Sequence, residues 1–311
     1  MTCIPTEKLS SGYDFPLIGY GTFGGSDGPN EVYTATKYAL ESGYRHFDTA
    51  YLYNTEEALG KAIKESGIDR KDLFITTKLW NNFHEAQHVR PALDMSLQNL
   101  QMNYVDLYLM HWPISFEFKG YEVASDEMNL KQTHVPIMET WRAMEQLVKD
   151  GVAHSIGVSN FTIEQLQEIL QQCEIPPAVN QIEIHPRLVQ QDMVTFCKEN
   201  NIVLTAFSPL GNPGYRTAQL KSVEEPKVKA IAEKYNKTPV QVLLNWGVNR
   251  GYAVIPKSVT PSRIKDNLVY FKMDKEDVDT ISELGRNSHI RTCSPVALWG
   301  DDCDVFNEVK K

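Results

Sequence analysis

Short apolar runs alternate with longer stretches in which apolar residues recur at helical spacing, almost from one end of the chain to the other. The runs have the length of strands, and the stretches between them have the period of amphipathic helices. The predicted strands are Leu17–Gly21, Arg45–Phe47, Leu73–Lys78, Val105–Met110, His154–Val158, Val179–Ile182, Val203–Phe207 and Ala253–Pro256. The predicted helices are Asn30–Ser42, Thr55–Ser66, His84–Leu100, Ile137–Lys149, Ile163–Gln172, Gln190–Asn200 and Pro226–Tyr235.

This alternation predicts a single (β/α)8 TIM barrel over residues 1–311. Strands separated by single helices pair in parallel through crossovers, and eight such units suit a barrel of this length. A doubly wound open sheet with a similar number of strands is the alternative that the pattern allows. Two stretches do not fit a short loop, namely Pro113–Pro136 and Gly285–Lys311. The first would rise on the carboxyl-terminal face of a barrel, where active sites lie.

The composition is typical of a globular protein, with 42% hydrophobic and 23% charged residues, and it excludes a mostly disordered chain. The 31 Lys and Arg residues against 40 Asp and Glu residues leave a net charge of −9. This acidic balance argues against nucleic-acid and membrane partners, which favour a basic surface. The five cysteines show no C-x-x-C spacing, and the chain begins without the apolar stretch of a signal peptide. We therefore expect a cytoplasmic protein in a reducing compartment.

Polar side chains gather at the carboxyl ends of the predicted strands. Asp48 and Tyr53 follow the second strand, Lys78 ends the third, and His111 follows the fourth. Because these ends share one face of a barrel, we expect the four side chains to meet there. Further polar or aromatic side chains lie at the ends of the later strands: Ser159, Asn160, Gln181, Glu183, Phe207, Ser208, Lys257 and Ser258.

The first four of these residues suit carbonyl reduction. A free tyrosine is a poor proton shuttle at neutral pH, but a neighbouring ammonium group lowers its pKa. Lys78, kept charged and oriented by Asp48, would make Tyr53 a general acid. A neutral His111 could donate a hydrogen bond to a carbonyl oxygen as negative charge develops there. No side chain delivers a hydride, so a nicotinamide cofactor is implied.

Three widely spaced segments resemble the signature segments of the aldo-keto reductases, in the same order. They are GYRHFDTAYLYNTEEALG (Gly43–Gly60), IGVSNF (Ile156–Phe161) and IPKSVTPSRIKDN (Ile255–Asn267), accompanied by KLW (Lys78–Trp80), HWP (His111–Pro113) and SPLG (Ser208–Gly211). The resemblance covers nearly the whole chain. It implies a (β/α)8 barrel and NADPH-dependent reduction of aldehydes or ketones to alcohols, without metal or flavin.

The resemblance also implies roles for single residues. It assigns proton donation to Tyr53, tuning of that tyrosine to Lys78 and Asp48, and orientation of the substrate to His111. It places the nicotinamide carboxamide against Ser159, Asn160 and Gln181, the nicotinamide ring against Phe207, and the pyrophosphate against Ser208, Leu210 and Gly211. Further cofactor contacts fall on Gly21, Thr22 and Phe23, and the adenine contacts fall on Asp266 and Asn267, although glutamate is usual where Asp266 stands.

The charges after the eighth predicted strand favour NADPH over NADH. Lys257, Ser258 and Arg263 could surround a dianionic 2′-phosphate, since arginine offers a forked donor and lysine a point charge. In an acidic protein, such a local basic cluster points to a phosphorylated ligand. Two solvated surface charges are the alternative.

Within the family, the chain resembles the aldose reductase and xylose reductase branch through KLWNNFH (Lys78–His84) and VPIMETW (Val135–Trp141). It departs from xylose reductases at Leu52, where they carry an aspartate, and at Arg291–Pro295, where they carry an asparagine in an R-F-N-D-P segment. Both changes remove polar groups that would bind sugar hydroxyls. We therefore expect a mostly apolar pocket that favours aromatic or aliphatic aldehydes over xylose. Its predicted walls are Phe23, Leu52, Trp80, Trp112 and Cys293.

Two short motifs suggest other functions. Gly19–Gly24 fits the G-x-G-x-x-G pattern, but Gly25–Pro29 delays the helix that a dinucleotide fingerprint requires. His84–His88 fits the H-E-x-x-H pattern of a zinc hydrolase, but no third ligand is evident, and we expect two exposed histidines instead. A non-catalytic structural or regulatory barrel is the remaining alternative. The family resemblance allows a monomer or a homodimer.

Overall fold

Eight parallel strands form one continuous sheet that closes on itself, and this confirms the predicted (β/α)8 barrel. The computed structural model describes residues 4–24, 28–121, 131–211, 220–286 and 288–308. In spatial order the strands are β3 (Tyr20–Gly21), β4 (His46–Asp48), β5 (Phe74–Leu79), β6 (Val105–Met110), β9 (Ala153–Ser159), β10 (Val179–Glu183), β11 (Val203–Phe207) and β12 (Ala253–Val254). The ring closes because Gly19 donates to the carbonyl of Val254 and Val254 donates to the carbonyl of Leu17, both at 2.9 Å. An open, doubly wound sheet would lack these bonds.

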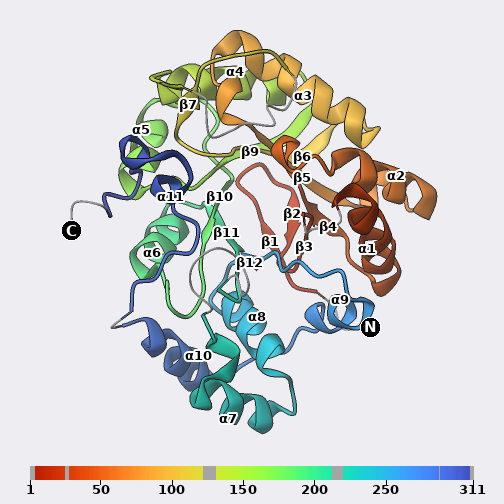
Figure 1. The fold of residues 1–311 in the computed structure, drawn as a ribbon, viewed down its shortest axis with the longest axis vertical. Helices are drawn as coiled ribbons and strands as arrows, with labels where there is room; N and C mark the ends of the chain where they lie inside the picture. The colour runs from red at the N-terminus through yellow and green to blue at the C-terminus, as the bar shows by residue number, and fades with distance from the viewer. Residues whose placement is uncertain (1–3, 25–27, 122–130, 212–219, 287, 309–311) are drawn as a thin grey trace.

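Helices surround the ring of strands and form the outer layer of the barrel (Figure 1). They are α1 (Gly28–Ser42), α2 (Glu56–Ser66), α3 (Ala86–Leu100), α4 (Ile137–Lys149), α5 (Ile163–Gln172), α6 (Gln191–Glu199), α7 (Pro226–Tyr235), α8 (Pro239–Asn249), α9 (Pro261–Asn267), α10 (Lys275–Ser282) and α11 (Pro295–Trp299). The seven predicted helices are all present, and their ends differ from the prediction by two residues or fewer. The last four helices, α8 to α11, were not predicted.

The helix α8 was missed because it has no exposed polar face. All residues from Gln241 to Val248 are buried, since the helix lies between the barrel and the neighbouring helices α7, α9 and α10. Its polar residues, Gln241, Asn245 and Asn249, form only a narrow stripe between apolar residues, so the sequence lacks the wide polar face that identified the other helices. A capping box at Thr238 and Gln241 fixes its first turn instead.

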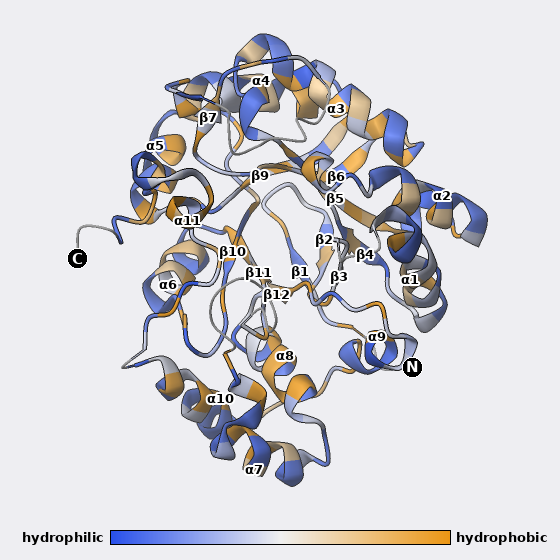
Figure 2. Cartoon of the chain, in the orientation of Figure 1, coloured by the Kyte–Doolittle hydropathy of each residue, from blue (hydrophilic) through white to orange (hydrophobic). Residues whose placement is uncertain are grey.

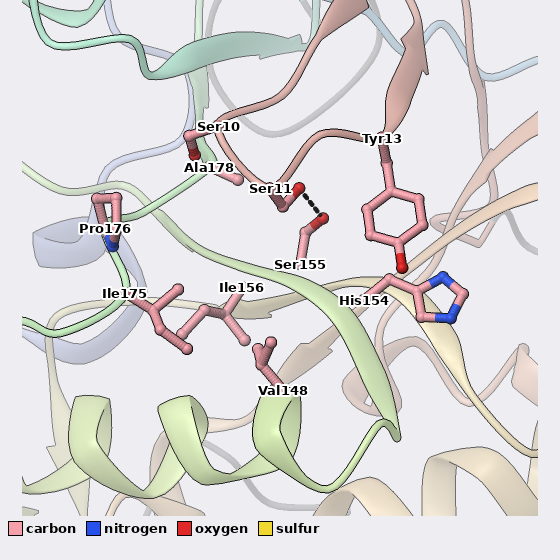
Figure 3. Close-up of a pocket in the computed structure, with 10 residues that line it drawn as sticks. All are labelled: Ser10, Ser11, Tyr13, Val148, His154, Ser155, Ile156, Ile175, Pro176 and Ala178. Carbon is pink, nitrogen blue, oxygen red and sulfur yellow. Dashed lines mark hydrogen bonds between the residues drawn. The ribbon is translucent and has the colours of Figure 1, made fainter.

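A β-hairpin covers the amino-terminal end of the barrel. Its strands β1 (Thr6–Lys8) and β2 (Asp14–Pro16) pair antiparallel and cross the middle of the ring in Figure 1. The turn of the hairpin meets the start of β9, where the hydroxyl groups of Ser11 and Ser155 lie 2.6 Å apart (Figure 3). The ring of Tyr13 stacks on the ring of His154 with 4.6 Å between centroids. These contacts close the amino end of the barrel.

The eight strands of the barrel are buried except at His154 in β9 and Phe207 in β11, which are partly exposed. Every residue of β5 and β6 is buried, as expected for strands that have the barrel interior on one side and helices on the other. Figure 2 shows orange, hydrophobic segments along these strands and blue, hydrophilic segments on the surrounding helices. Within the described part of the chain, no helix has both the length and the hydropathy needed to cross a membrane.

The two stretches that do not fit short loops meet at the carboxyl-terminal end of the barrel. After β6 the chain forms a small hairpin of β7 (Ser115–Phe116) and β8 (Gln132–Thr133), and the residues between 121 and 131 lie outside the described chain. The carboxyl-terminal segment contains α11. The rings of Phe116 and Trp299 lie 5.4 Å apart, so these two stretches pack against each other.

Candidate active site

A buried ion pair lies at the carboxyl ends of β4 and β5. Lys78 Nζ donates to Asp48 Oδ1 at 2.6 Å and to the carbonyl oxygen of Thr49 at 2.8 Å. The same nitrogen lies 3.4 Å from the hydroxyl oxygen of Tyr53. The Lys78 side chain is fully buried and that of Asp48 is 3% exposed. Three of the four residues predicted for the chemistry are therefore in contact, as their positions at strand ends predicted.

Tyr53 reaches the ion pair because the chain turns sharply after β4. Tyr51–Tyr53 forms a single turn of 3-10 helix, in which the Tyr53 N–H donates to the carbonyl of Ala50 at 3.0 Å. Asn54 follows with a φ of 52°, in the left-handed region that asparagine tolerates better than most residues. This turn brings the phenol back toward Lys78 on the neighbouring strand.

Burial and the negative charge of Asp48 raise the pKa of Tyr53 well above its usual value. The predicted lowering of this pKa by Lys78 does not appear as a net shift, because the loss of water on burial raises the pKa of the phenol. Burial lowers the pKa of Lys78, and the pairing with Asp48 opposes that shift. Tyr53 thus keeps its proton at neutral pH, which is the state that a proton donor requires.

His111 follows β6 and completes the group of four. Its ring centroid lies 5.7 Å from that of Tyr53 and 5.2 Å from that of Trp80. Burial, together with the charge of Lys78 and the neighbouring His84, lowers the pKa of His111 well below its usual value, in agreement with the predicted neutral imidazole. Its Nδ1 atom is buried and has no hydrogen-bond partner among the described residues. Such an atom is costly for stability.

The three residues predicted to hold the nicotinamide carboxamide are connected to this group. Gln181 donates from Nε2 to Asp48 Oδ2 at 2.6 Å. Ser159 donates to the carbonyl of Gln181 at 2.8 Å, and Asn160 donates to Ser159 Oγ at 3.1 Å and to the carbonyl of His111 at 3.0 Å. The contact between Gln181 and Asp48 was not predicted, since the two residues are 133 positions apart in the sequence. It joins the ion pair to the predicted cofactor site.

The residues predicted to contact the ring and the pyrophosphate follow β11. Phe207, Ser208 and Leu210 are partly exposed, whereas Gly211 is buried. Ser208 and Gly211 have φ angles of 48° and 77°, so this turn runs through the left-handed region twice. The segment Asn212–Glu225 is predicted to fold over the cofactor, and its first eight residues lie outside the described chain.

The end of β3 lies beside the ion pair. Gly21 and Thr22 are buried, and Thr22 donates from both its N–H and its Oγ1 to the carbonyl of Asp48 at 3.0 Å. Phe23 is 49% exposed, and its ring meets the ring of Tyr53 edge-on at 4.9 Å. These residues connect the first and second strands at the face where the predicted chemistry lies.

The two cations predicted to bind a 2′-phosphate follow β12, with Lys257 in the loop after the strand and Arg263 in α9. Lys257 and Arg263 are both exposed, so an anion in solution can reach them. Lys257 Nζ is 4.0 Å from a carboxylate oxygen of Glu31 in α1, which is a long contact for an ion pair. A phosphate group therefore competes for Lys257 with a weakly held partner.

The loop between β12 and α9 is anchored to β3. The Tyr20 hydroxyl donates to the carbonyl of Ser258 at 2.7 Å, and Ser258 Oγ accepts from the N–H of Thr260 at 3.2 Å. Asp266 and Asn267, predicted to contact adenine, are the last residues of α9; the first is exposed and the second is buried.

Aromatic side chains wall the other side of the site. Trp80 and Trp112 are each 4% exposed, and Leu52 and Cys293 are partly exposed. The indole of Trp299 contacts both tryptophans, with ring centroids 5.9 Å from Trp80 and 5.3 Å from Trp112. Sequence reasoning missed Trp299 because only the folded chain brings the carboxyl-terminal helix onto the barrel.

A separate cavity lies at the opposite end of the barrel. It has a volume of about 280 Å³ and is lined by the hairpin turn and by the start of β9, including Ser11, His154 and Ser155 (Figure 3). It is remote from the strand ends that carry Lys78. It therefore takes no part in the site described above.

A model of the aldo/keto reductase family matches residues 17–286 of this chain. The chain belongs to the aldo/keto reductase family. A glycerol 2-dehydrogenase (NADP(+)) from Hypocrea jecorina is 41% identical over 298 residues, which cover 92% of this chain and 93% of that protein. The aldose reductase from Schistosoma japonicum is 38% identical, with a TM-score of 0.87 over 98% of this chain and 99% of that one. An aldo-keto reductase complexed with NADPH has a TM-score of 0.86 and 35% identity, covering 99% of this chain and 95% of its own.

The prediction that both histidines of the H-E-x-x-H motif are exposed is wrong for this aldo/keto reductase. His84 is 4% exposed and precedes α3, which begins at Ala86. His88 lies in the helix, where its side chain is 12% exposed, stacks on Phe118 at 3.7 Å and has its Nδ1 2.9 Å from the hydroxyl of Tyr121. The two histidines are therefore packing residues and do not share a helical face. The described residues include no cluster of three potential metal ligands.

The buried imidazole of His84 should make this aldo/keto reductase sensitive to acid. Burial lowers the pKa of His84 from 6.5 to about 3. Between these values the unfolded chain binds more protons, so the free energy of unfolding falls as the pH drops. From pH 7 to pH 5 we expect His84 to account for a loss of about 2 kcal/mol.

Urea unfolding of the wild type and of His84→Gln at both pH values measures this contribution. The variant should lose less stability than the wild type on acidification, whatever its stability at pH 7. His289→Gln is the matched control, because it makes the same replacement at a histidine whose side chain is 65% exposed. An equal loss in all three proteins would contradict the assignment.

Proposed function

We propose that this protein is an NADPH-dependent reductase of aldehydes and ketones in which Tyr53 donates the proton. Family membership confirms the predicted class, an oxidoreductase that acts on carbonyl groups with NADPH. The observation that supports the role of Tyr53 is the position of Lys78 Nζ, between Asp48 Oδ1 at 2.6 Å and the Tyr53 hydroxyl at 3.4 Å. The proposal covers residues 1–311 as one barrel domain.

The residues at the carboxyl end of the barrel fit this cofactor. Asn160 and Gln181 offer amide groups next to the buried group of four, and Phe207 offers a partly exposed ring at the end of β11. Lys257 and Arg263 offer two exposed cations for a phosphate. When bound, NADPH supplies the hydride that reduces the carbonyl carbon.

Proton transfer follows from the environment of Tyr53. The phenol is protonated at rest, because burial and Asp48 raise its pKa, and it can donate to a carbonyl oxygen. As the proton leaves, negative charge forms on a hydroxyl oxygen that lies 3.4 Å from the ammonium group of Lys78. In a buried site this attraction is stronger than it would be in water, so Lys78 stabilises the phenolate as it develops. Asp48 keeps Lys78 charged despite its burial.

His111 orients the substrate in this proposal. Its imidazole is neutral, because burial lowers its pKa well below the usual value, and a neutral imidazole carries one N–H donor. A hydrogen bond from this donor would fix the carbonyl oxygen near the Tyr53 hydroxyl. The edge-on contact with Trp80, at 5.2 Å between ring centroids, holds the imidazole plane.

The pocket favours apolar carbonyl compounds in this proposal. Trp80, Trp112 and Trp299 form a continuous aromatic surface, and Leu52 adds an aliphatic side chain. The backbone N–H groups of Thr292 and Cys293 are already bound to a protein carboxylate, at 2.8 and 2.9 Å. They are therefore not available to the hydroxyl groups of a sugar.

We also propose a cytoplasmic location and a monomeric or homodimeric state. Free thiols at Cys173, Cys197 and Cys303 support a reducing compartment.

Replacing Tyr53 by phenylalanine should remove the proton donor. We expect kcat for benzaldehyde to fall by about 10²- to 10⁴-fold, the usual contribution of a positioned general acid, with little change in NADPH affinity. Stopped-flow reduction assays and NADPH fluorescence titration measure the two quantities. Tyr13→Phe is the control, because Tyr13 lies at the amino end of the barrel. Unchanged turnover in Tyr53→Phe would refute the assignment.

Replacing Lys257 by methionine should weaken NADPH more than NADH. A lost charge-assisted hydrogen bond costs about 1.5–3 kcal/mol, so the ratio of the two dissociation constants should shift by about 10- to 150-fold toward NADH. Lys275→Met is the control, since Lys275 is 86% exposed and lies in α10. Equal weakening of both cofactors would contradict a 2′-phosphate contact.

The wild-type enzyme should reduce benzaldehyde and short aliphatic aldehydes with kcat/KM at least about tenfold above that for xylose, since the pocket lacks partners for sugar hydroxyls. Initial rates at saturating NADPH over a series of aldehydes give the ranking. Equal or better efficiency with xylose would show that the departures at Leu52 and Cys293 do not determine specificity.

A further inference from the structure

The strand β10 ends on a buried carboxylate that the proposed reaction does not use. Glu183 is 1% exposed and lies two residues after Gln181, so both side chains lie on the same face of the strand. Gln181 contacts the ion pair through Asp48. Glu183 contacts the carboxyl-terminal segment of the chain, more than one hundred positions later in the sequence.

The Glu183 carboxylate accepts four hydrogen bonds. Its Oε1 accepts from Thr292 N at 2.8 Å, from Thr292 Oγ1 at 2.5 Å and from His185 Nε2 at 2.9 Å. Its Oε2 accepts from Cys293 N at 2.9 Å. Burial raises the pKa of this carboxyl group, but His185, Thr292 and Cys293 together lower it by more. The pKa of Glu183 therefore lies below the usual value. The group is therefore an acceptor at both oxygens at neutral pH.

These bonds fix the segment that forms one wall of the pocket. Cys293 lies close enough to Tyr53 to influence the pKa of that phenol. Two residues later the chain enters α11, which carries Trp299 against Trp80 and Trp112. The segment has no strand or long helix of its own to hold it. Its position over the barrel thus depends on bonds to the barrel, and Glu183 provides three of them.

We propose that Glu183 is a positioning residue that fixes the Thr292–Cys293 segment against the carboxyl end of the barrel and thereby sets the discrimination among carbonyl substrates. The proposal rests on the proposed reductase function. Glu183 acts through the segment that it holds, and it does not take part in the proton transfer between Tyr53 and the substrate.

Glutamine at this position tests the role with almost no change in volume. An amide offers one acceptor atom, and its NH2 group faces a backbone N–H in either orientation, so at least one bond to Thr292 or Cys293 is lost. Thr292→Val is a milder second variant, because it removes only the hydroxyl bond to Glu183. If Glu183→Gln folds poorly, Thr292→Val still tests whether the bonds to Glu183 position the segment.

Glu145 supplies a matched control. Its side chain is also 1% exposed, and its Oε1 accepts from two backbone N–H groups of a loop, those of Glu174 at 2.6 Å and Ile175 at 2.9 Å. It lies in α4 in the outer layer of the barrel. Glu145→Gln therefore reproduces the loss of a buried carboxylate that holds a loop, without touching the pocket wall.

The experiment compares the wild type, Glu183→Gln, Thr292→Val and Glu145→Gln. For Glu183→Gln we expect KM for a bulky aromatic aldehyde to rise about tenfold, with kcat and the NADPH dissociation constant changed by less than about threefold. KM for a short aldehyde should change much less. Alkylation of Cys293 by iodoacetamide, read by peptide mass spectrometry, should become at least about threefold faster as the segment opens. Thr292→Val should shift both readouts in the same direction by less.

Glu145→Gln should lower the melting temperature but leave KM and the alkylation of Cys293 unchanged. If Glu183→Gln behaves like Glu145→Gln in these two readouts, Glu183 has only a structural role and the proposal is overturned. If the wild type reduces no carbonyl compound, the reductase function fails, and the alkylation rates still decide whether Glu183 holds the segment. Faster alkylation with unchanged substrate ranking would overturn the link to specificity.

Discussion

The fully buried ammonium group of Lys78 is the constraint on which the carboxyl end of this barrel depends. Taking such a charge out of water costs several kcal/mol, whereas an exposed ion pair contributes about 0–1 kcal/mol, so the protein must surround Lys78 with acceptors. Asp48 and the carbonyl of Thr49 meet this requirement from the adjacent strand β4. The turn after β4 then brings Tyr53 to the same nitrogen. The buried charge that Asp48 and Thr49 stabilise is therefore the same charge that lies beside the Tyr53 hydroxyl.

The strand β10 extends this arrangement across the barrel. Asp48 has a second carboxylate oxygen, and Gln181 satisfies it from the opposite side of the ring. The next inward residue of the strand, Glu183, binds the carboxyl-terminal segment. Since successive inward residues lie two positions apart, one strand connects the ion pair to the pocket wall. A buried polar network of this kind is costly when any member is missing, because each member satisfies a group that has no access to water.

Most of the fold could be predicted from local sequence, and the failures have physical reasons. The helix α4 coincides with its predicted range because one of its faces is buried and the other is exposed. The strand β11 coincides because a strand buried on both sides is a short apolar run. The helix α8 has no exposed polar face and was missed. The positions of Asp48 and Lys78 followed from the rule that parallel strands end on one face. The raised pKa of Tyr53 did not follow, since it depends on how much water folding removes.

Contacts between distant segments account for what remained unpredicted at the site. The bond from Gln181 to Asp48, the bonds that Glu183 accepts from Thr292 and Cys293, and the contact of Trp299 with Trp80 all join residues from different parts of the chain. No local pattern identifies such pairs, because each partner alone has the composition of an ordinary strand end or loop.

The residues proposed for proton transfer and the residues proposed to contact the substrate come from distant parts of the chain. The ion pair and Tyr53 lie on β4, β5 and the turn between β4 and α2, and these elements are held by the ring itself. The pocket wall comes from the carboxyl-terminal segment, which reaches the ring through Glu183 and through the packing of Trp299. A substitution in that segment can change the space beside His111 without removing any acceptor from Lys78. In the proposed function, one buried charge can therefore serve different carbonyl substrates, because the segment proposed to select them contributes no acceptor to Lys78.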